Sequence, residues 1–306
     1  VSYFCIKKCL HIDLLYQRGK KNGAKLEIID RKQLKEVEPE AHSHTGKGLY
    51  LPDVKVVDPE AILERLVNQL KDNNVTIKFN SPLQTVDAEK SRITSGDQSF
   101  EYKHLYNATG QYAELIAQMF GAGKQYSILP IKGAYFQLAE NSNIKINKLI
   151  YPAPNLEMPF LGVHSVKTIS GNVYFGPSAI PAFGRENYHG LKGVDLIDAS
   201  KISMSLINMY WNNKHHFRQY VKQEAIRFLK PSFVKAVNAL VPRVKSHHLI
   251  SCNKVGIRAQ LFDKKRKEMV TDFVIERQGN TTHVLNAISP AFTCSFSFAK
   301  VIINSN

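Results

Sequence analysis

Apolar and polar residues alternate along this chain with two different periods, which predict a succession of helices and strands. The helical period predicts helices over residues 58–74, 112–120, 195–211, 221–240 and 291–303. Two-residue alternation, or a short apolar run between turn residues, predicts strands over residues 75–79, 84–86, 92–94, 104–107, 128–138, 149–151, 160–164, 172–175, 255–262, 269–275 and 283–285. Because helices and strands are mixed in this order, we expect an α/β (mixed α+β) fold in which a nucleotide-binding domain is interrupted by a β-rich domain.

Proline, glycine and small polar residues set several of the expected boundaries. Asp58 can cap the first predicted helix, and Pro59 suits its first position. Pro231 should break or kink the helix predicted over residues 221–240. The glycines of 121–124 (GAGK) resemble part of a dinucleotide loop, but they close a predicted helix instead of opening one. We therefore interpret them as a helix C-cap.

Composition and charge indicate a folded protein and bear on the kind of partner it binds. The chain has 306 residues, of which 43% are apolar and 22% charged, so it can form a folded core. Its net charge of +15 favours anionic partners, but the Lys and Arg residues are spread along the sequence. The densest basic run, 264–267 (KKRK), lies between two predicted strands and is interpreted as a solvated turn. We therefore expect no nucleic-acid binding.

The sequence also argues against metal, disulfide and membrane-spanning structures. Its four cysteines form no CxxC pair, which favours a reducing compartment such as the cytoplasm. Histidine pairs at 42/44, 215/216 and 247/248 lack carboxylates at zinc spacing, so we expect no metal site. No apolar run is long enough to span a bilayer. The first residue is Val1, from which we expect the chain to begin inside a longer reading frame or after processing.

Three features are candidates for chemistry. The segment 106–110 (YNATG) passes from a predicted strand into a helix through small residues, as phosphate-binding turns do, although a ligand-free turn gives the same pattern. His164 is either a base of near-neutral pKa or a structural histidine. Arg258 is either an anion-binding residue or a surface arginine.

Several segments together carry a resemblance to a known family. They are 16–23 (YQRGKKNG), 57–59 (VDP), 108–110 (ATG), 129–135 (LPIKGAY), 150–164 (IYPAPNLEMPFLGVH), 176–188 (GPSAIPAFGRENY), 256–260 (GIRAQ) and 283–293 (HVLNAISPAFT). In order and approximate spacing they resemble the L-2-hydroxyglutarate dehydrogenase/oxidase family, which belongs to the D-amino-acid-oxidase-like superfamily of FAD-dependent oxidoreductases. The set covers nearly the whole chain, whereas any one of these motifs alone is weak.

The resemblance implies an enzyme with FAD as its cofactor. It would oxidise L-2-hydroxyglutarate, a small dicarboxylate, at C2 to 2-oxoglutarate by hydride transfer to flavin. The electrons would then pass to oxygen or to a membrane quinone pool. The resemblance implies that the protein is cytoplasmic, or mitochondrial in a eukaryote. The basic surface permits peripheral contact with the inner membrane.

The resemblance also implies roles for individual residues. His164 would be the catalytic base. The substrate would be bound by Arg258, Arg185, Tyr135 and Tyr188. FAD would be lined by Ala108, Thr109, Gly110, Ser289, Pro290 and Thr293. The helix after this last loop would direct its N-terminus towards the flavin.

The same resemblance divides the chain into two domains and exposes departures from the family pattern. Residues 51–124 and 251–306 would form an incomplete FAD-binding domain, and residues 1–50 and 125–250 the substrate domain. The N-terminal βαβ unit with GxGxxG is not found in the sequence, Lys132 replaces an arginine, and bulky residues stand near the flavin loop at Phe292, Cys294 and Phe296. Two alternatives therefore stay open: an inactive fragment of this family, and an FAD-dependent amine or amino-acid oxidase.

Overall fold

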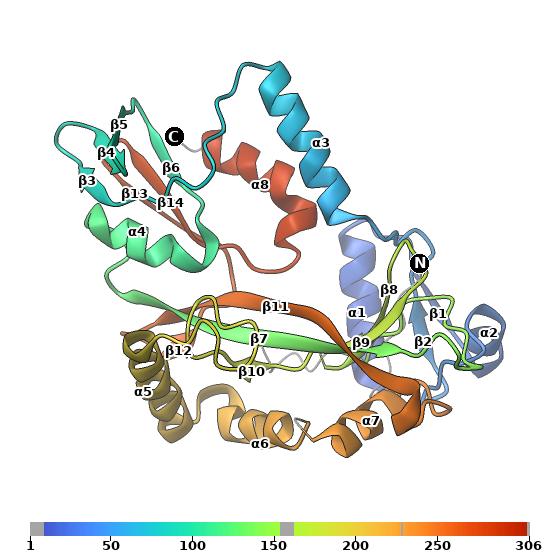
Figure 1. The fold of residues 1–306 in the computed structure, drawn as a ribbon. Helices are drawn as coiled ribbons and strands as arrows, with labels where there is room; N and C mark the ends of the chain where they lie inside the picture. Colours follow the sequence, from blue (N-terminus) through green and yellow to red (C-terminus); the bar gives the residue numbers. More distant parts are fainter. Residues whose placement is uncertain (1–8, 154–161, 228, 305–306) are drawn as a thin grey trace. The chain divides into compact units, whose positions relative to one another are not determined.

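The computed structural model describes residues 9–153, 162–227 and 229–304 (Figure 1). The chain divides into two compact units, each built from three separate stretches. Residues 1–75, 132–180 and 215–256 form the first unit, and residues 76–131, 181–214 and 257–306 form the second. These boundaries differ from the division expected from the sequence, since residues 51–75 fall in the first unit and residues 181–214 in the second. The FAD-binding and substrate-binding roles of the two parts stay predictions.

The first unit combines short strands with helices around a large apolar core and a smaller cluster of buried residues at Ile12, Leu26, Leu49 and Ala153. Its elements are α1 (Cys9–Lys21), β1 (Glu27–Ile29), α2 (Arg31–Val37), β2 (Gly48–Tyr50), α3 (Pro59–Asp72), β8 (His164–Lys167), β9 (Val173–Gly176), α6 (Phe217–Arg227), α7 (Lys230–Asn238) and the 3-10 helix η3 (Ser246–His248). β1 pairs with β2, and β8 pairs with β9, both antiparallel. Fully buried Phe175, Ile150, Phe233 and Val237 lie at the centre of the core.

The second unit contains two small sheets and three helices longer than one turn. Its elements are β3 (Thr85–Asp87), β4 (Arg92–Ser95), β5 (Gln98–Glu101), β6 (Leu105–Asn107), η1 (Gly110–Tyr112), α4 (Ala113–Met119), α5 (Leu196–Asn212), β12 (Glu268–Met269), β13 (Val274–Gln278), β14 (Thr281–Asn286) and α8 (Ala291–Asn304). One sheet has the order β3-β4-β5, and the other has the order β13-β14-β6. Its apolar core gathers Ala117, Ile128, Leu261 and Leu285.

Two long strands, β7 (Tyr126–Leu138) and β11 (Leu249–Asp263), run through both units. They belong to a sheet of order β12-β11-β7-β9-β8, in which the short strand β10 (Ile180–Pro181) also pairs with β7. The remaining 3-10 helix, η2 (Lys214–His216), lies where the chain passes from the second unit to the first. β11 and β12 are joined by the turn at 264–267, as the sequence predicts.

Helix boundaries agree with the local signals. Asp58 accepts hydrogen bonds from the backbone N–H groups of Glu60 and Ala61, and Pro59 begins α3, so this predicted helix start is confirmed. α6 ends at Arg227 and α7 begins at Lys230 with Pro231 in its first turn, which confirms the break but corrects the single helix expected over residues 221–240. Gly121 and Gly123 follow α4 with left-handed φ values of +87° and +67°, as a C-cap requires.

Four predicted strands need correction. Residues 75–79 are irregular because the Val75 N–H closes the end of α3 by donating to the Leu70 carbonyl. The Ile150 carbonyl accepts from the Ser165 N–H of β8, but residues 149–151 are irregular because the Ile150 N–H donates to the Ser165 hydroxyl instead of to a backbone carbonyl of that strand. The strand expected over residues 269–275 is divided into β12 and β13. Of the strand expected over 160–164, residues 160–161 lie outside the described residues, and His164 begins β8 instead of ending a strand.

The elements α1, β1, α2 and β2 were not expected from the sequence. One readable signal existed for α2. Asp30 accepts from the Gln33 backbone N–H, and the Gln33 side chain accepts from the Asp30 N–H, which is a capping box. In the part of the chain that the structure describes, no helix has the length and apolar character needed to cross a bilayer.

A buried carboxyl group connects the end of α2 with the loop at 147–148 in the first unit. Glu38, at the end of α2, is completely buried, and its Oε2 accepts from the N–H groups of Asn147 and Lys148 at 2.7 Å each. Its Oε1 is buried without a hydrogen-bond partner among the described residues. Burial therefore raises the pKa of Glu38, although the backbone hydrogen bonds oppose this.

This raised pKa predicts a pH-dependent stability. Because the folded pKa exceeds the unfolded value of about 4.5, the stabilisation from Glu38 is complete below that value and is lost as pH rises through the folded pKa. The free energy of unfolding of the unaltered protein, minus that of Glu38→Gln, should therefore fall as pH rises above about 4.5. Urea unfolding at several pH values measures this difference. Glu36→Gln, at an exposed position of the same helix, is the control and should give a flat difference; a flat result for Glu38→Gln would contradict the prediction.

Candidate functional site

The sheet β13-β14-β6 brings two predicted cofactor loops to one edge (Figure 1). β6 and β14 are parallel, with Leu105 opposite Thr281 and Asn107 opposite His283. Parallel strands present their carboxyl ends at the same edge, where α/β folds bind ligands. The loop after β6 and the loop after β14 therefore leave the sheet together. This pairing unites residues that are separated by about 180 positions in the sequence.

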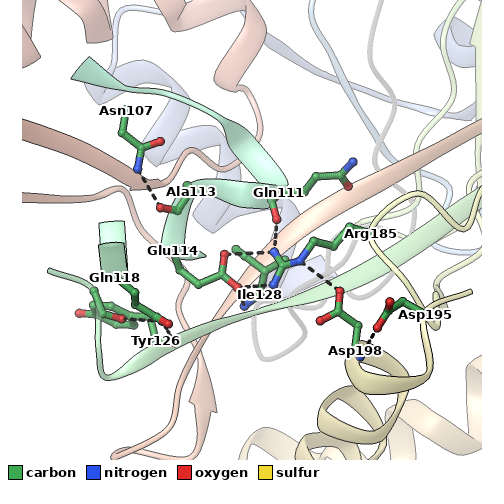
Figure 2. A network of polar contacts seen from close by, with 11 residues as sticks. Asn107, Gln111, Ala113, Glu114, Gln118, Tyr126, Ile128, Arg185, Asp195 and Asp198 are labelled. Carbon is green, nitrogen blue, oxygen red and sulfur yellow. Dashed lines mark hydrogen bonds and ion pairs between the residues drawn. The ribbon is translucent and has the colours of Figure 1, made fainter. Parts of the chain in front are cut away.

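The side chain of Asn107 holds the first loop through hydrogen bonds. This buried side chain accepts from the Thr109 hydroxyl at 2.7 Å. It donates to the Ala113 carbonyl at 2.8 Å (Figure 2). It also donates to His283 Nδ1, and burial lowers the pKa of His283, so the neutral ring is favoured. Ala108, Thr109 and Gly110 are all exposed, and Gly110 adopts a left-handed φ of +59°. Their backbone groups are therefore accessible to a ligand.

The second loop leads into the 14-residue helix α8. Ser289, Pro290 and Thr293 are exposed, and the Thr293 hydroxyl donates to the Pro290 carbonyl at 3.1 Å. The bulky side chains of Phe292 and Phe296 are 40% and 63% exposed. Exposed backbone groups and a helix N-terminus suit a nucleotide phosphate.

One buried atom gives an independent test of whether a cofactor fits this edge. Asn286 ends β14 and is only 2% exposed, yet its Oδ1 has no hydrogen-bond partner among the described residues. Buried polar atoms are nearly always satisfied by protein, water or ligand. This edge therefore has accessible loops, a helix N-terminus and an unsatisfied acceptor, which fit a nucleotide cofactor with hydrogen-bond donors.

Arg185 is held in a buried ion-pair network (Figure 2). Its Nη2 donates to Glu114 Oε1 at 2.6 Å and its Nη1 to Glu114 Oε2 at 3.1 Å. Nη1 also donates to the Gln111 carbonyl. Nε lies 3.3 Å from Asp198 Oδ2, a distance typical of an ion pair, although the angle does not qualify as a hydrogen bond. Two carboxylates of the second unit therefore surround this guanidinium.

This arrangement bears on the predicted role of Arg185. Arg185 and Glu114 are 9% and 2% exposed. Glu114 also accepts from the Ile128 N–H at 3.1 Å, so the pair joins the segment before α5, helix α4 and the first part of β7. A substrate carboxylate at Arg185 would add a further negative charge beside Glu114 and Asp198. The geometry favours a structural role, and the substrate role stays a prediction.

His164 and Tyr135 meet in the first unit around a third residue, Tyr151. The His164 ring stacks on Tyr151 with centroids 4.2 Å apart and an interplanar angle of 16°. His164 lies opposite Gly176 on β9, and a Cβ atom at Gly176 would stand 2.6 Å from Tyr135 Cδ1. Glycine at 176 therefore lets the Tyr135 ring approach this strand. Burial, together with the neighbouring Tyr135, raises the pKa of Tyr151 to about 12, so its phenol stays neutral at physiological pH.

The orientation of the His164 ring determines which nitrogen is basic. Nδ1 lies 3.0 Å from the Gly162 carbonyl oxygen. A carbonyl only accepts hydrogen bonds, so Nδ1 carries the proton in this contact and the lone pair of the neutral ring is on Nε2. His164 is 6% exposed. A buried, oriented imidazole with a basic Nε2 can accept a proton from a bound hydroxyl group.

The predicted site residues are thus distributed over both units. His164 and Tyr135 belong to the first; Arg258, Arg185, Tyr188 and the loop residues belong to the second. Arg258 is exposed on β11, and Tyr188 is half-buried in the same loop as Arg185. Sequence reasoning did not select Tyr151 or Asn286. Tyr151 is near the start of the motif at 150–164, which ends at His164, but only the fold brings the two rings into contact.

The Arg185 network generates a stability prediction. Arg185→Met should lower the free energy of unfolding by about 3–5 kcal/mol, because it leaves the Glu114 carboxylate buried without its partner. The control is Arg92→Met, which removes an exposed ion pair with Glu101 from the same unit and should cost about 1 kcal/mol or less. Urea unfolding followed by circular dichroism measures both. If Arg185→Met kept full stability and changed only the substrate KM, the structural interpretation would be wrong.

Comparisons of sequence give a consistent family. The profile of the FAD dependent oxidoreductase family matches residues 9–304. The mitochondrial L-2-hydroxyglutarate dehydrogenase of Caenorhabditis elegans is 29% identical over 306 residues, a match that covers 95% of this chain and 69% of the relative. The L-2-hydroxyglutarate dehydrogenase of Escherichia coli K12 is 28% identical over 299 residues, covering 95% and 68%.

Comparisons of structure confirm the fold class. L-alpha-glycerophosphate oxidase from Mycoplasma pneumoniae, solved with FAD bound, matches with a TM-score of 0.69 and 15% identity over 99% of this chain and 71% of that one. L-proline dehydrogenase from P. horikoshii matches with a TM-score of 0.63 and 11% identity, covering 97% and 70%. At these identities the likeness concerns the fold, which is the mixed α/β fold of FAD-dependent oxidases.

Proposed function

The chain belongs to the FAD dependent oxidoreductase family, whose cofactor is FAD, and we propose that it oxidises L-2-hydroxyglutarate, or a closely similar 2-hydroxy acid, to the 2-oxo acid. Curated relatives with this activity in their names match 95% of the chain. The observation that carries the proposal is the orientation of His164, which stacks on Tyr151 and directs its proton-bearing Nδ1 to the Gly162 carbonyl.

The reaction divides between the cofactor and the residues of this chain. FAD, when bound, supplies the acceptor for the hydride that leaves C2 of the substrate. His164 Nε2 takes the hydroxyl proton, so that the C2–O bond becomes a carbonyl as the C2–H bond breaks. The Gly162 carbonyl stabilises the imidazolium that results, because it accepts the Nδ1 proton in both states. The phenol groups of Tyr151 and Tyr135 can donate hydrogen bonds to substrate oxygens.

Recognition of a dianionic substrate requires cations. Arg258 is our proposed carboxylate ligand, because this residue is exposed on β11 and a guanidinium binds a carboxylate through two parallel hydrogen bonds. Arg185 is less suited, since Glu114 and Asp198 already neutralise it. Tyr188, half-buried three residues after Arg185, completes the proposed set.

The electrons leave the reduced enzyme by a separate step. We propose oxygen or a membrane quinone pool as the acceptor, and a protein that acts in the cytoplasm, at the periphery of the inner membrane, or in the mitochondrion. Oxygen consumption during turnover separates the two acceptors.

A panel of 2-hydroxy acids and amino acids tests the substrate class. Turnover of amino acids with none of L-2-hydroxyglutarate would replace the proposal with an amino-acid oxidase.

The role of His164 predicts a kinetic defect. His164→Asn retains an amide N–H that can bond the Gly162 carbonyl but removes the basic nitrogen. Reduction of bound FAD by substrate should slow by roughly 100-fold or more, with the melting temperature and bound FAD unchanged. Anaerobic stopped-flow absorbance measures the reduction rate. His247→Ala, at an exposed position of the same unit, is the control; a normal rate in His164→Asn would return His164 to a structural role.

The role of Arg258 predicts a binding defect. Arg258→Ala should raise the KM for L-2-hydroxyglutarate by roughly 10- to 100-fold, the factor expected for a lost charge-assisted hydrogen bond. The KM of Arg258→Lys should lie between that of the unaltered protein and that of Arg258→Ala, because lysine keeps the positive charge but cannot form two parallel hydrogen bonds to a carboxylate. Steady-state kinetics with saturating FAD give both values. An unchanged KM in Arg258→Ala would exclude Arg258 as the carboxylate ligand.

A further inference from the structure

Asn286 is fixed in position by two backbone carbonyl groups. Its Nδ2 donates to the Asp272 carbonyl at 2.6 Å and lies 3.4 Å from the Val270 carbonyl oxygen. The opposite amide orientation would direct Oδ1 at these two oxygens, and two acceptors cannot bond each other. The contacts therefore fix which end of the amide is the carbonyl end, and Oδ1 points away from the segment between β12 and β13.

The carbonyl end of Asn286 is the unusual part of this side chain. Oδ1 is buried and has no hydrogen-bond partner in the described parts of the chain. An unsatisfied buried acceptor is unfavourable, so such atoms in native proteins call for a specific explanation. At Asn286 the location supplies one, because the residue ends β14 immediately before the loop that leads to α8.

The backbone around Asn286 has an irregularity in strand pairing. Asn286 lies opposite Val274, where the register of β13 and β14 shifts. Such irregularities are over-represented next to active sites, where they redirect a side chain. Asn286 also continues β14 three residues beyond His283, which is paired with Asn107 at the end of β6. Its amide is therefore on the edge from which both exposed loops leave the sheet.

The chemistry of Oδ1 limits its partner to a hydrogen-bond donor. Phosphate oxygens are acceptors and are excluded. A flavin nucleotide offers hydroxyl groups on its sugar chains and an N–H group on its ring. We propose that Asn286 Oδ1 accepts a hydrogen bond from a hydroxyl or ring N–H group of bound FAD, which makes Asn286 a cofactor-positioning residue. The inference rests on the cofactor of the family, not on the identity of the substrate.

Titration of FAD into the complete protein, followed by flavin fluorescence, tests this assignment without any assay of activity. Asn286→Ala should raise the Kd for FAD roughly tenfold, the effect of one hydrogen bond. Asn107→Ala is the comparison variant: it should also weaken FAD binding, because Asn107 supports the loop at 108–110, but it removes no hydrogen-bond acceptor from the cofactor. Asn107 is equally buried at the neighbouring strand end, but its polar atoms are already bonded within the protein.

Analogues of FAD then identify the donor and separate direct contact from disturbed structure. An N3-methyl analogue lacks the ring N–H group, and deoxy analogues each lack one hydroxyl group. One analogue should bind the unaltered protein roughly tenfold more weakly than FAD, yet bind Asn286→Ala no more weakly than FAD does. For Asn107→Ala, each analogue should lose affinity relative to FAD by the same factor as it does with the unaltered protein, because Asn107 does not contact the missing group.

Three results would overturn the assignment. The first is an Asn286→Ala variant that binds FAD as tightly as the unaltered protein. The second is an unaltered protein that binds every analogue as tightly as FAD, which is decisive even if the variant does not fold. The third is a complete protein that binds no FAD. Failure of L-2-hydroxyglutarate turnover with FAD binding intact would instead refute only the proposed substrate.

Discussion

The buried pair of Arg185 and Glu114 is the interaction on which the second unit depends. Two opposite charges removed from water are tolerated only when both are paired and their remaining hydrogen-bonding groups are satisfied. Glu114 meets this condition with Arg185 and the Ile128 N–H. Arg185 meets it at its two Nη atoms, with Glu114 and the Gln111 carbonyl, while its Nε has only the ion-pair contact with Asp198. The pair thereby fixes α4, the start of β7 and α5 relative to one another within this unit.

The consequences of this pair extend to the proposed cofactor loop. Glu114 follows Ala113, whose carbonyl accepts from Asn107, and Asn107 in turn holds Thr109. A shift of α4 would therefore alter the loop at 108–110. The sheet contributes the second constraint, because the parallel pairing of β6 with β14 makes the two loops leave from one edge. An ion pair and a strand register together position the two loops.

The first unit prepares a different kind of chemistry. Its strands β8 and β9 place His164 opposite a glycine, and the absence of a side chain at Gly176 leaves room for the Tyr135 ring. Tyr151 then covers the imidazole and stays protonated because its phenol is buried. Buried polar groups do not all have the same meaning in this protein. Glu38 holds the loop at 147–148, whereas Asn286 ends the strand that leads into the second predicted cofactor loop.

The sequence by itself determined the family, the boundaries of α3, α4, α5 and α8 to within two residues, and the candidate residues. Local signals were sufficient where the cause was local: Asp58 and Pro59 begin α3, and Pro231 separates α6 from α7. They failed where a distant partner decides the outcome, as at Ile150, whose N–H donates to the side chain of Ser165 instead of to a backbone carbonyl.

Only the tertiary structure decided what the candidate residues contact. Arg185 has the residue type of a carboxylate ligand, but Glu114, 71 positions earlier, already binds it. The stacking of Tyr151 on His164 and the unsatisfied Oδ1 of Asn286 likewise have no signal in the sequence. The physical reason is that residue type and spacing specify what a side chain can bond, while burial and the approach of remote segments determine which of those bonds are made.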